Sequence, residues 1–120
     1  SGQSILVVED EPLILEYLEN VLGEKNYKVY QAKNGQQATD EFNKRRNEIS
    51  VLLTDANLPD INGIDLAEKL REQRKDLKVI VSSGFSRQKA LKSKIFDENY
   101  KYIQKPYGID ELLEIVKSIV

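Results

Sequence analysis

Apolar and polar positions follow two patterns that take turns along the chain. Short apolar runs are typical of buried strands, and longer segments with apolar residues every three or four positions are typical of helices that face a core. The predicted strands are 5–9, 27–32, 50–54, 78–82 and 100–103. The predicted helices are 11–25, 36–46, 64–74, 87–97 and 109–120. This alternation favours an α/β fold, in which helices cover both faces of a parallel sheet.

Single residues mark where several of these elements begin and end. Pro12 stands near the start of the first helix, where its missing N–H is tolerated, and Glu11 before it is a candidate cap. Ile14 belongs to the apolar stripe of that helix and is expected to face the core. No linker or repeat divides the chain, so we expect a cloning remnant or disordered start over 1–3 and a single domain over 4–120.

Composition and charge exclude several kinds of protein. The net charge is −2, so direct binding of nucleic acid is not expected. No apolar run approaches the roughly 20 residues of a membrane helix, and we expect a cytoplasmic domain without membrane contact. The chain has no Cys and no His, which excludes disulfides, thiolate catalysis and histidine-dependent triads. Chemistry must come from carboxylates, lysines, hydroxyls and amides.

The predicted strands end in residues that can do such chemistry. The first ends in Glu9 and Asp10, the third in Asp55 and the fourth in Ser83, and Lys105 follows the fifth. The carboxyl ends of parallel strands share one edge, where open α/β sheets bind their ligands. Carboxylates brought together there repel each other unless a cation or a shared proton intervenes. Because only oxygen donors are present, the expected cation is Mg²⁺ or Ca²⁺.

This set of residues fits phosphoryl transfer to a carboxylate. Asp can act as a covalent nucleophile, and an ionised Asp55 needs no base. We expect Lys105 to pair with Asp55 at rest and to neutralise a phosphoryl oxygen later, while Ser83 donates a hydrogen bond to the same group. A phosphohistidine donor would have to lie on a partner. The glycine motifs of nucleotide-binding sites are absent. The run that starts at Asp55 begins like a calcium-binding loop, but Pro59 and Asp60 stand where that loop needs a ligand and a glycine.

Four segments, each at the end of a predicted strand, resemble the receiver domains of two-component response regulators. They are 7–12, 53–63, 82–85 and 102–107, and the resemblance covers essentially the whole chain. It implies a flavodoxin-like (βα)5 fold, a doubly wound five-stranded parallel sheet with strand order 2-1-3-4-5. Segment 82–85 also resembles the receivers of hybrid histidine kinases, so the chain is expected to be part of a longer protein.

The resemblance also implies a role for each matching residue. Asp55 would accept the phosphoryl group, with Lys105 and Ser83 as its catalytic partners. Ser83 and Tyr102 would form the switch, in which the ring moves inward when the hydroxyl engages the phosphoryl group. Glu9 would contact the Mg²⁺ through a metal-bound water, and Mn²⁺ is expected to substitute for Mg²⁺. The implied metal site consists of Glu9 (through water), Asp10, Asp55 and the backbone carbonyl of Asn57.

The function implied by the resemblance is a phosphorylation-activated signalling switch. A histidine kinase or histidine phosphotransfer protein would donate the phosphoryl group, and the domain would catalyse its own phosphorylation and slow dephosphorylation without being a conventional enzyme. The face built from 87–97, 100–103 and 109–120 would then regulate an output, and could join two copies as a homodimer. Glu9 and Ser83 stand where Asp and Thr are more usual, and Phe85 occupies a position that tunes dephosphorylation.

Simpler interpretations exist for the same residues. Asp10 could cap the first helix, and Asp55 could be an ordinary turn residue at a strand end. The chain could also be an interaction module that works without phosphorylation. A small-molecule phosphatase is a weaker alternative, because it needs an acid two residues after Asp55, where Asn57 stands. Pro106 would be explained if a cis peptide bond fixed the loop there.

Overall fold

The computed structural model describes residues 3–84 and 99–120. Its strands are β1 (Ser4–Val8), β2 (Lys28–Ala32), β3 (Ile49–Asp55), β4 (Lys78–Ser83) and β5 (Tyr100–Gln104). The helices in the described residues are α1 (Pro12–Glu24), α2 (Gly35–Lys44), α3 (Gly63–Gln73) and α5 (Ile109–Ile119). The predicted helix 87–97 and Phe85 lie outside the described residues.

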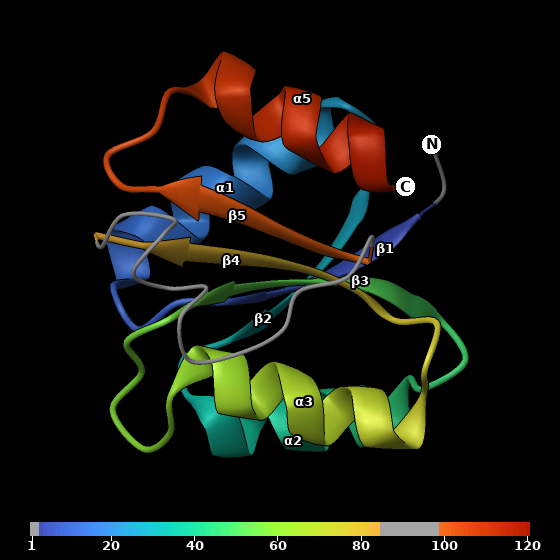
Figure 1. The fold of residues 1–120 in the computed structure, drawn as a ribbon. Coiled ribbons are helices and arrows are strands. Elements are labelled where there is room, and N and C mark those ends of the chain that lie inside the picture. Colours follow the sequence, from blue (N-terminus) through green and yellow to red (C-terminus); the bar gives the residue numbers. More distant parts are fainter. Residues whose placement is uncertain (1–2, 85–98) are drawn as a thin grey trace.

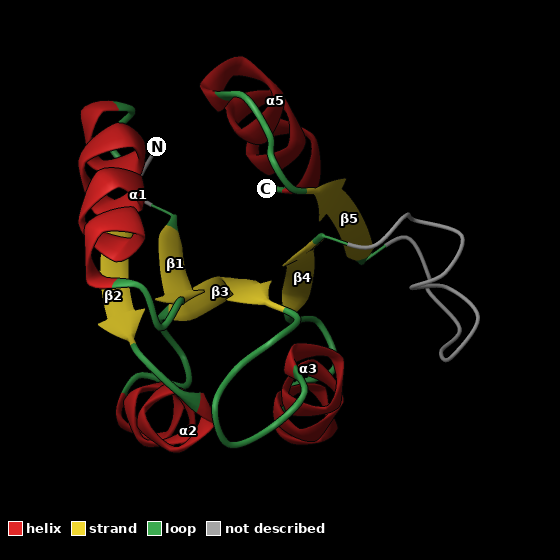
Figure 2. Cartoon of the chain, turned by 90° about the vertical axis from the view of Figure 1, so that its left-hand side faces the viewer, coloured by secondary structure: helices red, strands yellow, loops and turns green. Residues whose placement is uncertain are grey.

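The five strands form one parallel sheet in the order β2-β1-β3-β4-β5. Helices α1 and α5 cover one face of this sheet, and α2 and α3 cover the other (Figures 1 and 2). The predicted flavodoxin-like fold is therefore confirmed. None of the helices in the described ranges is long and apolar enough to cross a membrane.

The sheet separates two apolar clusters because successive side chains of a strand point to opposite faces. In β1, Ile5 and Val7 belong to one cluster, and Leu6 and Val8 belong to the other. The first cluster includes Leu18, Leu22, Leu112 and Val116 from α1 and α5. The second includes Ala38, Phe42, Leu66 and Leu70 from α2 and α3. The centre of the sheet is thus buried on both faces, which leaves its edges for chemistry.

Two predictions about α1 are wrong. Glu11 precedes the helix, but its side chain makes no capping hydrogen bond. The Glu9 carboxylate, two residues earlier, accepts the Glu11 N–H at 3.1 Å. Ile14 is 38% exposed, since Leu15 and Leu18 occupy the inward positions of the helix. Pro12 does lie in the first turn, as predicted.

Candidate functional site

Strand register brings the predicted chemical groups to one edge of the sheet. Val8 pairs with Thr54, so Glu9 lies next to Asp55 across the β1–β3 boundary. Asp55 in turn pairs with Ser82 of β4. Beyond the last β4–β5 pair, the Lys105 N–H donates to the Ser83 carbonyl at 2.7 Å. The residues that we expected at a common edge do meet there.

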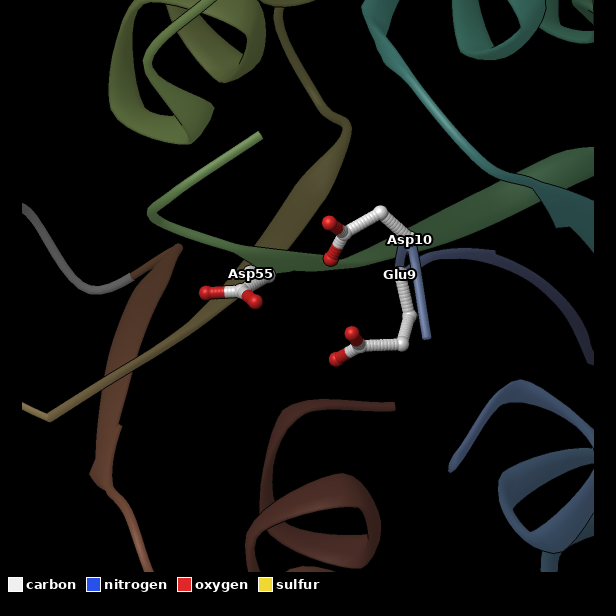
Figure 3. A group of neighbouring side chains, drawn as sticks. All are labelled: Glu9, Asp10 and Asp55. Carbon is white, nitrogen blue, oxygen red and sulfur yellow. The ribbon is translucent and has the colours of Figure 1, made fainter. Parts of the chain in front are cut away.

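Three carboxylates converge at this edge. Glu9, Asp10 and Asp55 each offer an oxygen, and these oxygens all lie within 4.8 Å of one another. Figure 3 shows the three side chains reaching toward a common space from β3 and from the turn after β1. Glu9 is only 3% exposed and Asp55 7%, whereas Asp10 is open to solvent. So compact a group of negative charges needs positive charge beside it.

Lys105 supplies part of that charge. Its Nζ lies 2.9 Å from Asp55 Oδ2 and 3.4 Å from Glu9 Oε1. Burial acts to lower the pKa of Lys105, but the hydrogen bond and charge of Asp55 and the charge of Glu9 outweigh it, so that the pKa is raised above 10.5. Lys105 is therefore a firmly charged ammonium that bridges two acids, and its predicted resting contact with Asp55 is present.

The two buried acids also accept backbone hydrogen bonds. Asp55 Oδ1 accepts the Asn57 N–H at 3.1 Å, while its other oxygen receives Lys105. Glu9 Oε2 accepts the Glu11 N–H. Burial raises the pKa of Glu9 above its usual 4.5, although the Glu11 N–H and the Lys105 charge act in the opposite direction. Desolvation thus dominates at Glu9, and this carboxylate is held in its charged form at a cost.

The loop after β3 folds tightly over Asp55. Asn57 and Asn62 form an isolated antiparallel bridge, and the Gly63 N–H donates to the Ala56 carbonyl at 2.8 Å. A Cβ on Gly63 would lie 2.1 Å from the Asp55 carbonyl oxygen, so only glycine allows this close approach. Asn62 then caps α3 by accepting the Ile64 N–H at 2.7 Å. Asn57 is in this way held directly beside Asp55.

The predicted switch residues lie at the same edge. Ser83 ends β4 and is 1% exposed. Tyr102 of β5 is buried, and its hydroxyl donates to the Ser83 carbonyl at a long 3.4 Å. The Lys105–Pro106 peptide bond is cis, as the position of Pro106 suggested. The Ser83 carbonyl therefore accepts both the Tyr102 hydroxyl and the Lys105 N–H, which links the three residues.

The site fits a hard divalent cation. Its donors are carboxylate and carbonyl oxygens without nitrogen or sulfur, which is the set that Mg²⁺ prefers. The mutual repulsion of Glu9, Asp10 and Asp55 is a second reason, since a cation among their oxygens would relieve it. Of the three, Asp10 is the most accessible to a hydrated ion.

An apolar surface borders the site and was not predicted. Ile14 and Tyr17 of α1 line a pocket with Lys105, Pro106 and Tyr107. Tyr17 is 50% exposed, and burial raises the pKa of Tyr107 above 10.0. One feature of the sequence could have indicated this surface, because α1 has more apolar residues than fit on its inward face. Asp60, whose contacts are described below, had no such signal.

Comparison with known proteins identifies the family to which the chain is similar. The model of the response regulator receiver domain matches residues 5–117. Sporulation initiation phosphotransferase F of Bacillus subtilis is 27% identical over 98% of this chain and 93% of its own length. Sensor kinase CckA of Brucella abortus is 25% identical over 98% of this chain, which spans only 12% of that kinase.

A solved structure has the same fold. Response regulator protein TrrA from Thermotoga maritima, crystallised in complex with Mg(2+)-BeF, superposes with a TM-score of 0.83 at 32% identity. The match covers 98% of this chain and 99% of that one. Receiver domains interact with histidine kinases or phosphotransfer proteins, and they bind Mg²⁺ at an acidic pocket. On its sequence and its fold, the chain belongs to the response regulator receiver domain family.

Proposed function

We propose that this domain is a phosphorylation-activated switch in which Asp55 accepts a phosphoryl group from a phosphohistidine on a partner protein. The observation that carries the proposal is the position of Asp55, which is buried, 2.9 Å from the Lys105 ammonium and among the oxygens of Glu9 and Asp10. An aspartate with those neighbours is poised for attack and for neutralisation of the incoming charge.

Mg²⁺, or Mn²⁺ in its place, would be held by Asp10, Asp55 and the Asn57 carbonyl, with Glu9 acting through a bound water. The ion would neutralise charge on the phosphoryl oxygens. Support comes from the oxygen-only donor set and from the carboxylates lying within 4.8 Å of one another. The structure of TrrA was determined in complex with Mg(2+)-BeF, which supports an ion at the corresponding place in this chain.

In the transfer itself, an Asp55 oxygen forms a bond to phosphorus while the bond from phosphorus to the partner's imidazole nitrogen breaks. The electron pair of the broken bond stays on the imidazole. Lys105 leaves Asp55 Oδ2 and pairs with a phosphoryl oxygen, a short movement for a side chain already 2.9 Å away. The transition state is loose, so positioning and charge neutralisation provide most of the catalysis. Slow hydrolysis of the acyl phosphate would reset the domain.

The switch would run through Ser83 and Tyr102. The Ser83 hydroxyl would donate to a phosphoryl oxygen, and Tyr102, whose hydroxyl contacts the Ser83 carbonyl, would follow any shift of that backbone. The face of β5, α5 and the predicted helix 87–97 would then change its affinity for an output partner or for a second copy of the chain. Such two-state changes involve a few kcal/mol.

The donor would dock on the apolar surface next to the site. Leu13 is 80% exposed and Tyr17 50%, and Ile14, Pro106 and Tyr107 continue this surface to Lys105. A partner helix with its phosphohistidine turned toward Asp55 could bury these side chains.

A cytoplasmic location and the division into residues 1–3 and a domain over 4–120 stay predictions.

Phosphorylation by a small donor tests the proposal directly. Incubation with Mg²⁺ and acetyl phosphate should add one phosphoryl group to the intact mass, and Asp55→Asn should remove this labelling. An unchanged mass, or equal labelling of Asp55→Asn, would overturn the proposal. In that case an amide NMR titration that shows no Mg²⁺ binding would favour an interaction module independent of phosphorylation.

A further inference from the structure

The loop that carries Asn57 is tied to a distant helix by one side chain. Asp60, at the tip of this loop, accepts the Gly35 N–H at 2.8 Å through Oδ1 and the Gln36 N–H at 3.0 Å through Oδ2. Both donors belong to the first turn of α2, whose free N–H groups and dipole favour a carboxylate. Hydrogen bonds to a charged acceptor are among the stronger ones.

The packing around this contact is close. A Cβ on Gly35 would lie 2.3 Å from Ile61 Cγ2 and 3.2 Å from Asp60 Oδ1. A larger residue at position 35 would therefore require the side chain of Ile61 to shift. The two hydrogen bonds also lower the pKa of Asp60, led by the bond from Gly35, so the side chain is ionised at neutral pH.

The loop is thus fixed at both ends. At its base the Asn57–Asn62 bridge closes it, and the Asn57 N–H reaches Asp55 Oδ1. At its tip the Asp60 side chain is held by its two hydrogen bonds to α2. Without the Asp60 side chain, residues 58–61 would be held only at the base of the loop. The backbone of Asn57 would then sample more orientations around Asp55.

We propose that Asp60 is a positioning residue for the metal site, which fixes the Asn57 backbone by anchoring the β3–α3 loop to the N-terminus of α2. This role rests on the proposed function, because it concerns the carbonyl that would complete the Mg²⁺ site. Asp60 itself touches neither the metal nor the phosphoryl group. Its contribution is to reduce the freedom of a ligand that the chain must otherwise order when the ion binds.

A matched pair of variants separates positioning from simple helix capping. Asn34 caps the same helix, since its Oδ1 accepts the Gln37 N–H at 2.8 Å, but it does not belong to the β3–α3 loop. Asp60→Ala and Asn34→Ala should therefore both lower the thermal midpoint. Only Asp60→Ala should weaken Mg²⁺ binding, by about fivefold (~1 kcal/mol), and Asp60→Asn, which keeps one oxygen acceptor, should fall between it and the wild type.

The measurements are an amide NMR titration with MgCl₂ alone and a thermal melt of each variant. Gly35→Ala provides a second route, because the added Cβ crowds Ile61 and Asp60 without removing the carboxylate, and it should also weaken Mg²⁺ binding. Equal Mg²⁺ affinity in Asp60→Ala and Asn34→Ala would overturn the role of Asp60 while normal labelling of the wild type still supports the proposed function. A wild type that neither binds Mg²⁺ nor is labelled would overturn both.

Discussion

The centre of the sheet and two acids at its carboxyl edge are almost equally buried, but these are opposite kinds of residue. Leu52 and Ile80, in the middle of β3 and β4, are 0% exposed, and Glu9 and Asp55 at the edge are 3% and 7% exposed. Burial of the first pair stabilises the fold by about 25 cal/mol for each Å² of apolar surface. Burial of a carboxylate costs free energy unless it is paired and hydrogen-bonded.

The edge recovers part of this cost locally. Asp55 has Lys105 on one oxygen and the Asn57 N–H on the other, and Glu9 has Lys105 and the Glu11 N–H. The carboxylates still lie close enough to share a cation. The comparison teaches that the apolar centre provides the stability with which the domain maintains a buried, charged edge, as is common at functional sites.

The largest effect should come from the apolar centre. Leu22 is fully buried in the C-terminal half of α1, away from the carboxylates. Leu22→Ala should lower the free energy of unfolding by about 2–5 kcal/mol, through lost burial and a cavity. Urea denaturation measures this loss, and an NMR titration of the folded protein should give an unchanged Mg²⁺ affinity. A loss of Mg²⁺ binding in the folded variant would mean that centre and edge are not separable.

Removing a charge from the edge should have a smaller effect of opposite sign. Glu9→Gln keeps the shape and an acceptor for the Glu11 N–H, but it no longer repels Asp55. We expect the free energy of unfolding to rise by roughly 1 kcal/mol and the Mg²⁺ affinity to fall roughly tenfold.

The control for Glu9→Gln is Glu16→Gln on the exposed side of α1. It makes the same chemical change away from the site, and its stability should stay within about 0.5 kcal/mol of the wild type. If Glu9→Gln were less stable than this control, the Glu9 charge would be a net stabilising group and the contrast between edge and centre would be wrong.

The stability difference between the wild type and Glu9→Gln should depend on pH. Burial raises the pKa of Glu9 above 4.5, so the folded state binds a proton that the unfolded state has already released. In the window from 4.5 up to the raised pKa, stability therefore decreases as pH increases. Glu9→Gln lacks this term, while groups with lowered pKa such as Asp60 and Asp76 affect both proteins alike.

Unfolding of both proteins in urea at several pH values, without Mg²⁺, measures this dependence. The advantage of Glu9→Gln should be full at neutral pH and should shrink as pH falls toward 4.5. A difference that stayed constant over this range would show that Glu9 titrates normally in the folded protein.

Much of the edge could be predicted from the sequence because four of the five predicted strands are followed closely by a residue that can do chemistry. Asp10, Asp55 and Lys105 are marked by their positions alone, once parallel strands bring their ends together. The strand order came from the resemblance to a family and not from the pattern. The switch roles of Ser83 and Tyr102 stay predictions, although both residues lie at the expected edge.

What the sequence did not predict depends on contacts between loops. Glu11 has the right position for a cap, yet its side chain makes no capping hydrogen bond, and residue type and position alone do not show this. Asp60 lies 25 residues from Gly35, and nothing local to either indicates their hydrogen bond. Ile14 fits the apolar stripe of α1, but three-residue and four-residue spacings alone do not say which apolar residue will stay exposed.

The smallest effect should come from a residue where centre and edge meet. Tyr102 packs in the cluster below α2 and α3, and its hydroxyl reaches the Ser83 carbonyl at 3.4 Å. Tyr102→Phe keeps the apolar contacts and removes the hydroxyl, so stability should fall by no more than about 1 kcal/mol. Mg²⁺ affinity and labelling by acetyl phosphate should not change, because Tyr102 is neither a ligand of the proposed metal site nor the proposed phosphoryl acceptor.

Spectra of the unphosphorylated and phosphorylated forms then distinguish two interpretations of Tyr102. If its ring follows Ser83, the amide shifts that phosphorylation causes along β5 should be smaller in Tyr102→Phe than in the wild type, although both are equally labelled. Identical shifts would mean that Tyr102 is simply part of the apolar centre. Tyr102 both packs in the apolar cluster and contacts the Ser83 carbonyl at the edge. This result therefore decides whether Tyr102 transmits the conformational change from the phosphorylated edge to β5.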